Sequence, residues 1–226
     1  MASTGLFSAC GQRKLRFELG SDSVVTLNGF ILDYVGDIAA AAILEEKRTK
    51  RMIERDWRRF FDYHTQGTFK SFYRGSESPE SPYWRLLIYD LRQTTKGWRR
   101  CKVEDREKYI TWASVGVVAA NEVTRNFNTE IHVQGVRLFF THNGFVGVGP
   151  DAMESGDSIA ILAGGSLPYV LRPVPDAARH NTFELFGCCY VHGVMDGQAV
   201  HGLGKEEPPL PDPNMPKTEW YDIHIV

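Results

Sequence analysis

The fold is decided by a strand-rich stretch in the second half of the chain, which reads Arg137-Leu138-Phe139-Phe140-Thr141-His142-Asn143-Gly144-Phe145-Val146-Gly147-Val148-Gly149-Pro150. It holds two short apolar runs, at 136–141 and 145–148, and its closing glycines and proline end a strand and set a turn. Further apolar runs, punctuated by glycine and proline, follow at 158–163, 169–172 and 182–191. Short strands at this spacing predict a small twisted β-barrel or sandwich.

The beginning of the chain also predicts strands. Residues 13–35 alternate apolar and polar positions in places and are interrupted at Gly20-Ser21-Asp22 and at Asn28-Gly29. The second interruption is a dipeptide suited to a two-residue hairpin turn. Because these strands are too few to bury a face alone, we expect them to pair with the strands of the second half.

The middle of the chain, residues 38–126, changes to helical periodicity. Between 38 and 64 the aromatic and aliphatic side chains recur at steps of three and four, at Ile53, Trp57, Phe60, Phe61 and His64. This spacing predicts a long amphipathic helix. A second helix is expected at 83–91, after a loop rich in glycine, proline and serine, and a third at about 103–126. The third helix has an apolar side formed by Tyr109, Ile110, Ala113 and Val117.

Together these segments predict an α+β fold in a single domain, residues 1–226. A small twisted β-barrel or sandwich, built from 13–35 and 136–200, packs against a bundle of about three helices from 38–126. Residues 205–217 contain five prolines, at 208, 209, 211, 213 and 216, and are expected to lie extended over the surface. Residues 220–226 alternate again and are expected to dock as an edge strand.

Composition excludes several classes of protein. With 42% apolar and 24% charged residues, the chain can bury a core and has no sign of disorder. The net charge is −2, and the basic residues of 47–59 are interleaved with acidic ones, which predicts a solvated helix face and no nucleic-acid partner. The chain lacks an apolar run of about 18 residues and a signal peptide at its N-terminus. We therefore expect a cytoplasmic protein without a membrane span.

No motif for a metal or an organic cofactor is present. The four cysteines lack a C-x-x-C spacing, and the adjacent Cys188 and Cys189 point to opposite faces of a strand. The histidines form no metal-binding pair at helical spacing, and the chain has no phosphate-binding loop. We expect neither a metal nor a cofactor.

The strand-rich half resembles a known family. The quoted stretch is followed by Gly156-Asp157, by the strand-forming block at 164–173 that ends Val170-Leu171-Arg172-Pro173, and by the closing block at 187–197 that contains Tyr190-Val191-His192-Gly193. This series resembles the C-terminal half of fungal heterokaryon-incompatibility (HET) proteins, although Gln198 stands where that family has Glu. The resemblance implies a HET-type module without the N-terminal effector region, so cell-death triggering is not expected to carry over.

Candidate site residues lie in the closing block and in the helices. His192 and Asp196, four residues apart in a bend, could form an oriented imidazole and carboxylate pair, with Tyr190 as a further donor. The alternative is that they satisfy backbone groups in a tight turn. Arg172 could hold an anionic ligand group or pair with Asp157 or Asp196. The substrate-facing wall would be formed by Trp57, Phe61 and Trp84, which could equally be core residues.

Two main hypotheses for function follow. The first is a cofactor-free cyclase or isomerase, such as a pericyclase of Diels–Alder type, acting on a small hydrophobic metabolite in fungal secondary metabolism. Such chemistry requires shape and one or two donors, and the sequence offers no nucleophile motif. The alternative is a non-enzymatic HET-type recognition module. A hydrolase or transferase that uses His192 and Asp196 is a third hypothesis. Oligomeric state and substrate are left open by the sequence.

Overall fold

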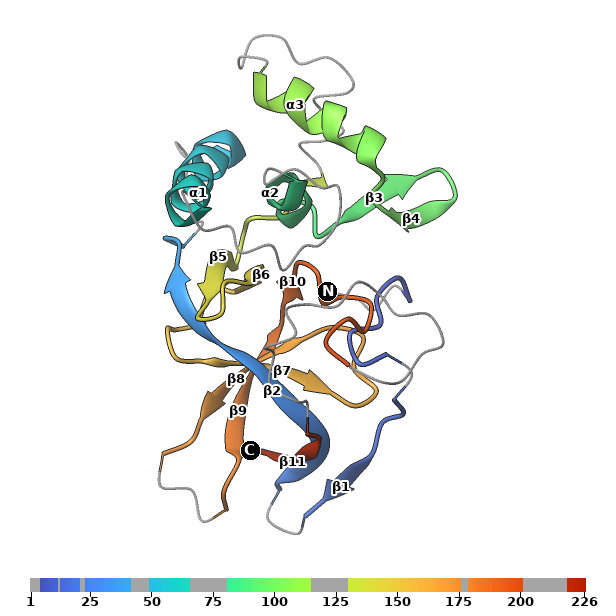
Figure 1. Ribbon diagram of the computed structural model, residues 1–226, viewed down its shortest axis with the longest axis vertical. Helices are drawn as coiled ribbons and strands as arrows, with labels where there is room; N and C mark the ends of the chain where they lie inside the picture. The colour runs from blue at the N-terminus through green and yellow to red at the C-terminus, as the bar shows by residue number, and fades with distance from the viewer. Residues whose placement is uncertain are drawn as a thin grey trace.

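A single long strand, β2 (Val25–Ile38), runs through the β-structure of the protein and belongs to both of its halves (Figure 1). The computed structural model describes residues 5–11, 13–20, 23–41, 49–65, 81–114, 130–175, 179–200 and 219–226. The expected hairpin turn at Asn28-Gly29 is wrong, because β2 continues straight through it. Gly29 instead lets two neighbouring strands approach, since a Cβ there would lie 2.7 Å from Leu162 Cδ2 and 2.8 Å from the carbonyl oxygen of Ile161.

The first half of β2 forms a closed ring of strands. It pairs on one side with β11 (Tyr221–Ile225) and on the other with β7 (Ser158–Leu162). The ring is completed by β8 (Tyr169–Pro173) and β9 (Thr182–Cys188), because β7 pairs with β8, β8 with β9, and β9 with β11. Its interior holds a small buried cluster, Ala160, Leu162, Leu171, Phe183 and Ile223. Because the ring of strands is closed, the β-module is a barrel and not a sandwich.

The C-terminal segment forms a strand, but its expected position at an edge is wrong. β11 lies between β2 and β9, antiparallel to the first and parallel to the second. Its alternation places Ile223 in the barrel interior, which explains why a short terminal strand occupies a central position.

The second half of β2 leads into a smaller group of strands above the barrel. There β2 pairs with β5 (Val136–Thr141), which pairs with β6 (Val146–Pro150), which pairs with β10 (Tyr190–Val191). One face of this layer packs on the outside of the barrel through the cluster that contains Phe30, Phe139, Ile159, Ile161 and Val191. The other face, with Leu138, Phe140, Val146 and Tyr190, packs against the helices.

A helical layer covers that outer face (Figure 1). It consists of α1 (Lys50–Thr65), α2 (Ser81–Leu86) and α3 (Arg106–Ser114), the last preceded by a 3₁₀ turn, η1 (Val103–Asp105). In α1 the predicted stripe is confirmed, because Ile53, Trp57 and Phe61 are buried. These side chains meet Leu138, Phe140 and Val146 in one cluster.

Three details of the helical region differ from expectation. The second helix ends at Leu86, and the N–H of Asp90 donates to the carbonyl of Arg85 at 2.8 Å, which closes a turn that contains residues at positive φ. A hairpin follows, β3 (Leu91–Thr94) and β4 (Gly97–Arg100), because residues 91–100 offer no apolar stripe for a helix.

The buried side of α3 also differs from the predicted one. Tyr109 and Trp112 are buried, whereas Ile110 is 46% exposed and Ala113 is exposed, so the helix turns another face to the core. Val117, residues 115–126 and the proline-rich segment at 205–217 lie outside the described residues.

The α+β class with a barrel-like module is confirmed. As expected, the N-terminal strands pair with later ones, since β2 pairs with β5, β7 and β11, while a short β1 (Phe17–Leu19) pairs with β2. The predicted strands of 136–191 recur within a few residues of their expected bounds. None of the helices in the described ranges is long and apolar enough to cross a membrane.

Candidate functional site

The closing block of the sequence lies where the barrel, the upper strands and the β3–β4 hairpin meet. Tyr190 is buried in the cluster beneath the helices, with its ring centroid 6.2 Å from that of Phe7 and 6.4 Å from that of Tyr89. Its hydroxyl lies 3.0 Å from Nδ1 of His192, which is itself 7% exposed. Tyr190 and His192, predicted together, are therefore in direct contact.

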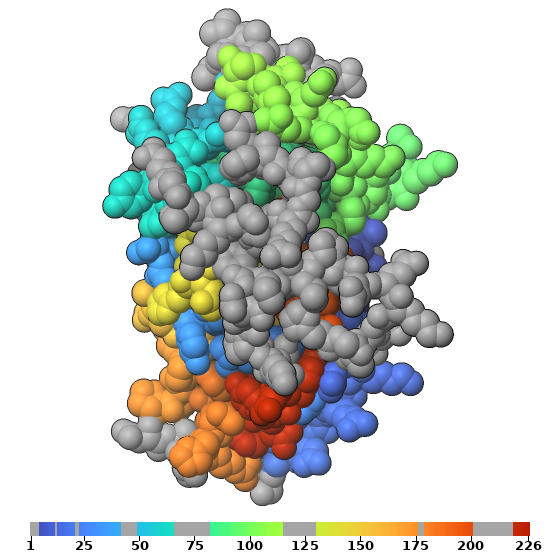
Figure 2. Space-filling model, in the orientation of Figure 1, coloured from blue at the N-terminus to red at the C-terminus, as the bar shows by residue number. Residues whose placement is uncertain are grey.

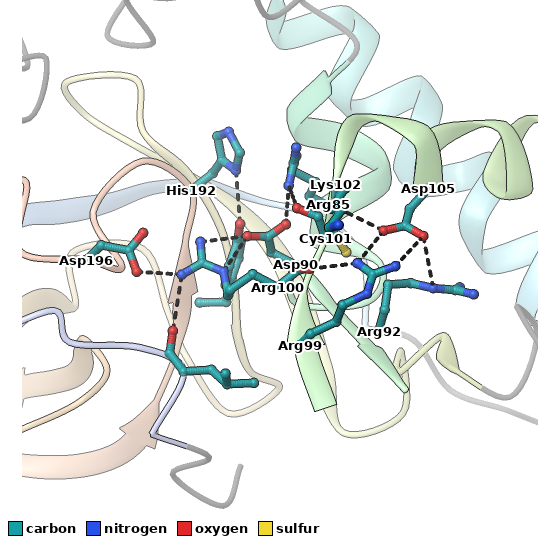
Figure 3. Close-up of polar contacts among 12 residues, drawn as sticks. Arg85, Asp90, Arg92, Arg99, Arg100, Cys101, Lys102, Asp105, His192 and Asp196 are labelled. Carbon is teal, nitrogen blue, oxygen red and sulfur yellow. Dashed lines mark hydrogen bonds and ion pairs between the residues drawn. The ribbon is translucent and has the colours of Figure 1, made fainter. Parts of the chain in front are cut away.

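Asp196 faces a different partner (Figure 3). Its carboxylate accepts a hydrogen bond from the Arg100 guanidinium at 2.5 Å, and Arg100 also donates to Asp90 at 2.7 Å. The amide of Gln198 donates to the same Asp196 carboxylate at 3.3 Å, while its oxygen accepts the Asp196 N–H at 2.7 Å. An ionised Glu at position 198 has no proton to donate, so this departure from the family pattern changes a contact at the site.

A chain of ion pairs extends from Asp196 into the helical layer (Figure 3). Asp90 lies between Arg100 and Arg85, and both carboxylate and guanidinium of the Arg85–Asp90 pair are buried. Asp90 has a φ of 56°, in the left-handed region, so the backbone carries a local cost that these contacts offset. The network joins α2, the hairpin and the closing block.

A second group of charges is centred on Asp105 at the start of α3. Its carboxylate accepts two hydrogen bonds from Arg99, at 2.7 and 3.0 Å, and one from the backbone N–H of Lys102 at 2.9 Å. Burial alone would raise the pKa of Asp105, but the Arg99 and Lys102 donors outweigh it and lower that pKa. Nearby, Arg92 pairs with Glu130, whose pKa burial raises in spite of the guanidinium.

The thiol of Cys101 lies beside these charges and is held in its neutral form. Burial, followed by the carboxylate of Asp90, raises its pKa far above the ordinary range of a thiol. Cys189 is fully buried, and its pKa is likewise raised by burial and by Cys188. Neither thiol is set up as a nucleophile.

Arg172 pairs with Asp157, one of the two carboxylates that the sequence offered as its partner. Its guanidinium donates to both oxygens of Asp157, at 2.8 and 3.0 Å, and to the carbonyl of Ala152 at 3.0 Å. Glu154 completes the cluster, with its carboxylate 3.2 Å from Arg172. This arrangement ties β8 to the turn before β7 and is separate from the Asp196 network.

The three predicted wall residues lie inside the core. Trp57 and Phe61 are 2% exposed and Trp84 is 1% exposed, and all three belong to the cluster that also contains Tyr190. The structure thus brings Tyr190 into the same cluster as the aromatic side chains, and places Asp196 and Arg172 in ion pairs elsewhere.

The sequence reasoning missed the charged residues of 85–105. Arg85, Asp90, Arg99, Arg100 and Asp105 were not singled out, because the segment was interpreted as helix and loop. A usable signal was present, since basic residues surround Trp98, with acidic residues at both ends of a stretch that has no apolar periodicity. Among the described residues, no cluster of three or more His, Cys, Asp or Glu side chains could bind a metal ion.

Residues 35–208 match the family described as the Het-6 beta-barrel domain, which covers more than half of the chain. The chain belongs to this family. The matched residues include β7, β8 and β9 of the closed ring, and the predicted resemblance to HET proteins is confirmed.

One curated relative adds to the family match. The chain is 38% identical over 76 residues to "Heterokaryon incompatibility protein 6, OR allele" of Neurospora crassa. The alignment covers 34% of this chain and 11% of that protein, so the chain corresponds to a small part of a much longer relative. No solved structure matches the chain.

Proposed function

We propose that this chain is a non-enzymatic recognition module of heterokaryon-incompatibility type. The observation that carries the proposal is that the polar residues of the motif are bonded to other residues of the protein. Tyr190 contacts His192, Asp196 binds Arg100, and Arg172 binds Asp157. The Asp196 and Arg172 contacts join separate segments of the fold, and the Tyr190 contact lies within the closing block. The Neurospora relative is named as a heterokaryon incompatibility protein.

The cyclase hypothesis has less support. A cyclase needs its aromatic side chains to face a substrate, whereas Phe61 packs on Tyr83 and Phe140 with ring centroids 5.1 and 5.9 Å apart. The family description and the name of the relative contain no reaction. A hydrolase or transferase would need Asp196 to orient His192, and Asp196 is held by Arg100.

A recognition module needs a rigid scaffold that presents exposed side chains. The β3–β4 hairpin fits this need, because Arg99 and Arg100 anchor it to Asp105, Asp90 and Asp196. Trp98, which directly precedes these two arginines, is 42% exposed. An anchored, half-exposed tryptophan is the kind of residue that contributes most to protein interfaces. We propose that Trp98 forms part of the recognition surface.

The test is a heterokaryon assay in which one of two otherwise compatible fungal strains expresses the chain. We expect expression to change heterokaryon growth rate, and the fraction of fused compartments stained by a vital dye, with some partner strains and not others. Trp98→Ala should remove the effect. Tyr190→Phe, matched in that it also alters one aromatic side chain, should keep it.

Both variants must keep the melting temperature to within a few degrees for the comparison to hold. An effect lost in Tyr190→Phe and kept in Trp98→Ala would place the activity at the closing block and contradict the proposal. Equal growth with every partner strain, with or without the chain, would also contradict it.

A further inference from the structure

The strand β1 and the two residues before it, called here the β1 edge (residues 15–19), are exposed on both faces. Leu15, Phe17 and Leu19 are 57%, 62% and 71% exposed, which is unusual for three large apolar side chains on alternate positions. The intervening Arg16 and Glu18 are exposed as well. In the described part of the chain β1 pairs only with β2, and Figure 1 places it at the outer margin of the barrel. Figure 2 shows the corresponding blue atoms projecting at the lower right.

The hydrogen bonding between β1 and β2 fixes which backbone groups point outward. The N–H of Gly20 donates to the carbonyl of Val24 at 2.9 Å, so these residues form a hydrogen-bonded pair. In an antiparallel ladder such pairs alternate, and Glu18 opposite Thr26 is the next one. Phe17 and Leu19 therefore direct their N–H and C=O groups away from β2. Leu15 precedes the strand, and its backbone passes close to Gly164.

The sequence of the β1 edge is self-complementary when read antiparallel. It runs Leu15-Arg16-Phe17-Glu18-Leu19, so a second copy centred on Phe17 sets leucine against leucine and phenylalanine against phenylalanine. Arg16 then lies opposite Glu18 of the second copy, twice by symmetry. The parity also fits, because the residues with outward backbone groups become the hydrogen-bonded pairs.

We propose that the β1 edge is a self-association surface, at which two copies of this chain pair their β1 strands antiparallel about a two-fold axis through Phe17. Each copy covers the edge of the other's β1 strand that has no strand partner among the described residues, and exposed strand edges tend to pair in this way. Opposite charges and aromatic pairs in register each stabilise such a ladder. The proposal is independent of the recognition function.

The apolar face of the β1 edge extends the inner face of the barrel. Phe17 lies opposite Leu27 and Leu19 opposite Val25, and directly opposed residues point to the same side of a sheet. Leu27 packs at the margin of the barrel interior. Because a pairing of five residues falls short of the roughly 1,200 Å² that stable interfaces bury, the dimer should form in a concentration-dependent way.

A charge-reversal experiment by sedimentation equilibrium tests the register. Arg16→Glu and Glu18→Arg each set two like-charged pairs across the proposed axis, and each should weaken self-association about tenfold. The two variants mixed at equal concentration should form a heterodimer with the wild-type affinity, because both pairs become attractive again. The double variant Arg16→Glu/Glu18→Arg should also self-associate like the wild type.

A second pair of variants shows whether an added charge disrupts self-association only at the proposed axis. Phe17→Arg sets two guanidinium groups against each other at the axis and should leave the chain monomeric, while Tyr63→Arg, on the 74% exposed Tyr63 of α1, should not change association. A wild-type chain that remains monomeric up to its solubility limit would overturn the proposal. So would a dimer that persists in Phe17→Arg, or single-charge variants that the mixture fails to rescue.

Discussion

At the scale of single residues, two arginines show how far a local pattern can be followed. Arg172 binds Asp157, which lies close in sequence and was one of the two carboxylates considered for it. Arg100 binds Asp196 across 96 residues of sequence, and no local spacing could have indicated that pair. The contact of Tyr190 with His192 was accessible to sequence reasoning because both residues lie in one motif. Partners in the site become unpredictable where the fold, and not the spacing, joins them.

The pKa of Glu54 gives a prediction at the same scale. Burial raises it above its ordinary value near 4.5, and this outweighs the hydrogen bond from Tyr109 and the attraction of Arg58. A carboxyl whose folded-state pKa is above its unfolded one binds protons more readily when folded. It therefore stabilises the fold at low pH and loses that contribution as pH rises through the raised pKa.

Glu54→Gln should remove this dependence. The neutral amide can still accept the Tyr109 hydroxyl, which lies 3.0 Å from Glu54 Oε1. We expect the free energy of unfolding of the variant to fall less than that of the wild type as pH rises above the ordinary carboxyl pKa, and to equal or exceed it at neutral pH. Urea titrations at several pH values measure this, with Glu107→Gln, an exposed carboxyl on α3, as control. An unchanged pH slope in Glu54→Gln would contradict the expectation.

At the scale of elements, β6 depends on close approach to its neighbours. A Cβ on Gly147 would lie 2.5 Å from Phe139 Cζ and 2.6 Å from the carbonyl oxygen of Tyr190, so neither β5 nor β10 leaves room for one. Gly147→Ala should therefore cost about 2–3 kcal/mol through overpacking. Gly156→Ala is the matched control, because Gly156 has a φ of 92° and open space around it, and should cost about 1 kcal/mol. Chemical denaturation measures both, and a larger loss in Gly156→Ala would contradict this account.

Which elements could be predicted follows from what determines each one. The strands of 136–191 are apolar runs bounded by glycine and proline, and α1 has a regular stripe, so local pattern sufficed. The β3–β4 hairpin is polar, and ion pairs with residues outside it, including the distant Asp196, hold it in place, so its sequence carried no apolar period. Asn28-Gly29 has the composition of a turn, yet Gly29 is required where β7 and β11 crowd β2. Tertiary contact overrode local preference in both cases.

At the scale of the whole molecule, adjacent layers are joined by two hydrophobic clusters that they share. Phe7 belongs to the cluster under the helices, while the nearby Ala9 and Cys10 belong to the cluster on the outside of the barrel. β2 contributes Phe30 to the second cluster and Leu27 to the margin of the barrel interior. The barrel interior draws on the ring strands alone, whereas the other two clusters each combine side chains from more than one layer. The expectation of a single domain can be tested on this basis.

The layers should therefore unfold together. In a Trp220→Phe background, which removes the tryptophan that packs on Phe30 beside the barrel, fluorescence reports mainly on the helical layer through Trp57, Trp84 and Trp112. Far-ultraviolet circular dichroism reports on the strands as well. We expect the two signals to give coincident urea transitions. Ile223→Ala empties part of the barrel interior, on the side of the molecule away from the helices, and should lower stability by about 2–4 kcal/mol. If the layers are coupled, it shifts the fluorescence transition as far as the dichroism transition. A tryptophan transition left in place by Ile223→Ala would mean that the helical layer folds independently of the barrel, and the shared clusters would then not be enough to make one cooperative unit.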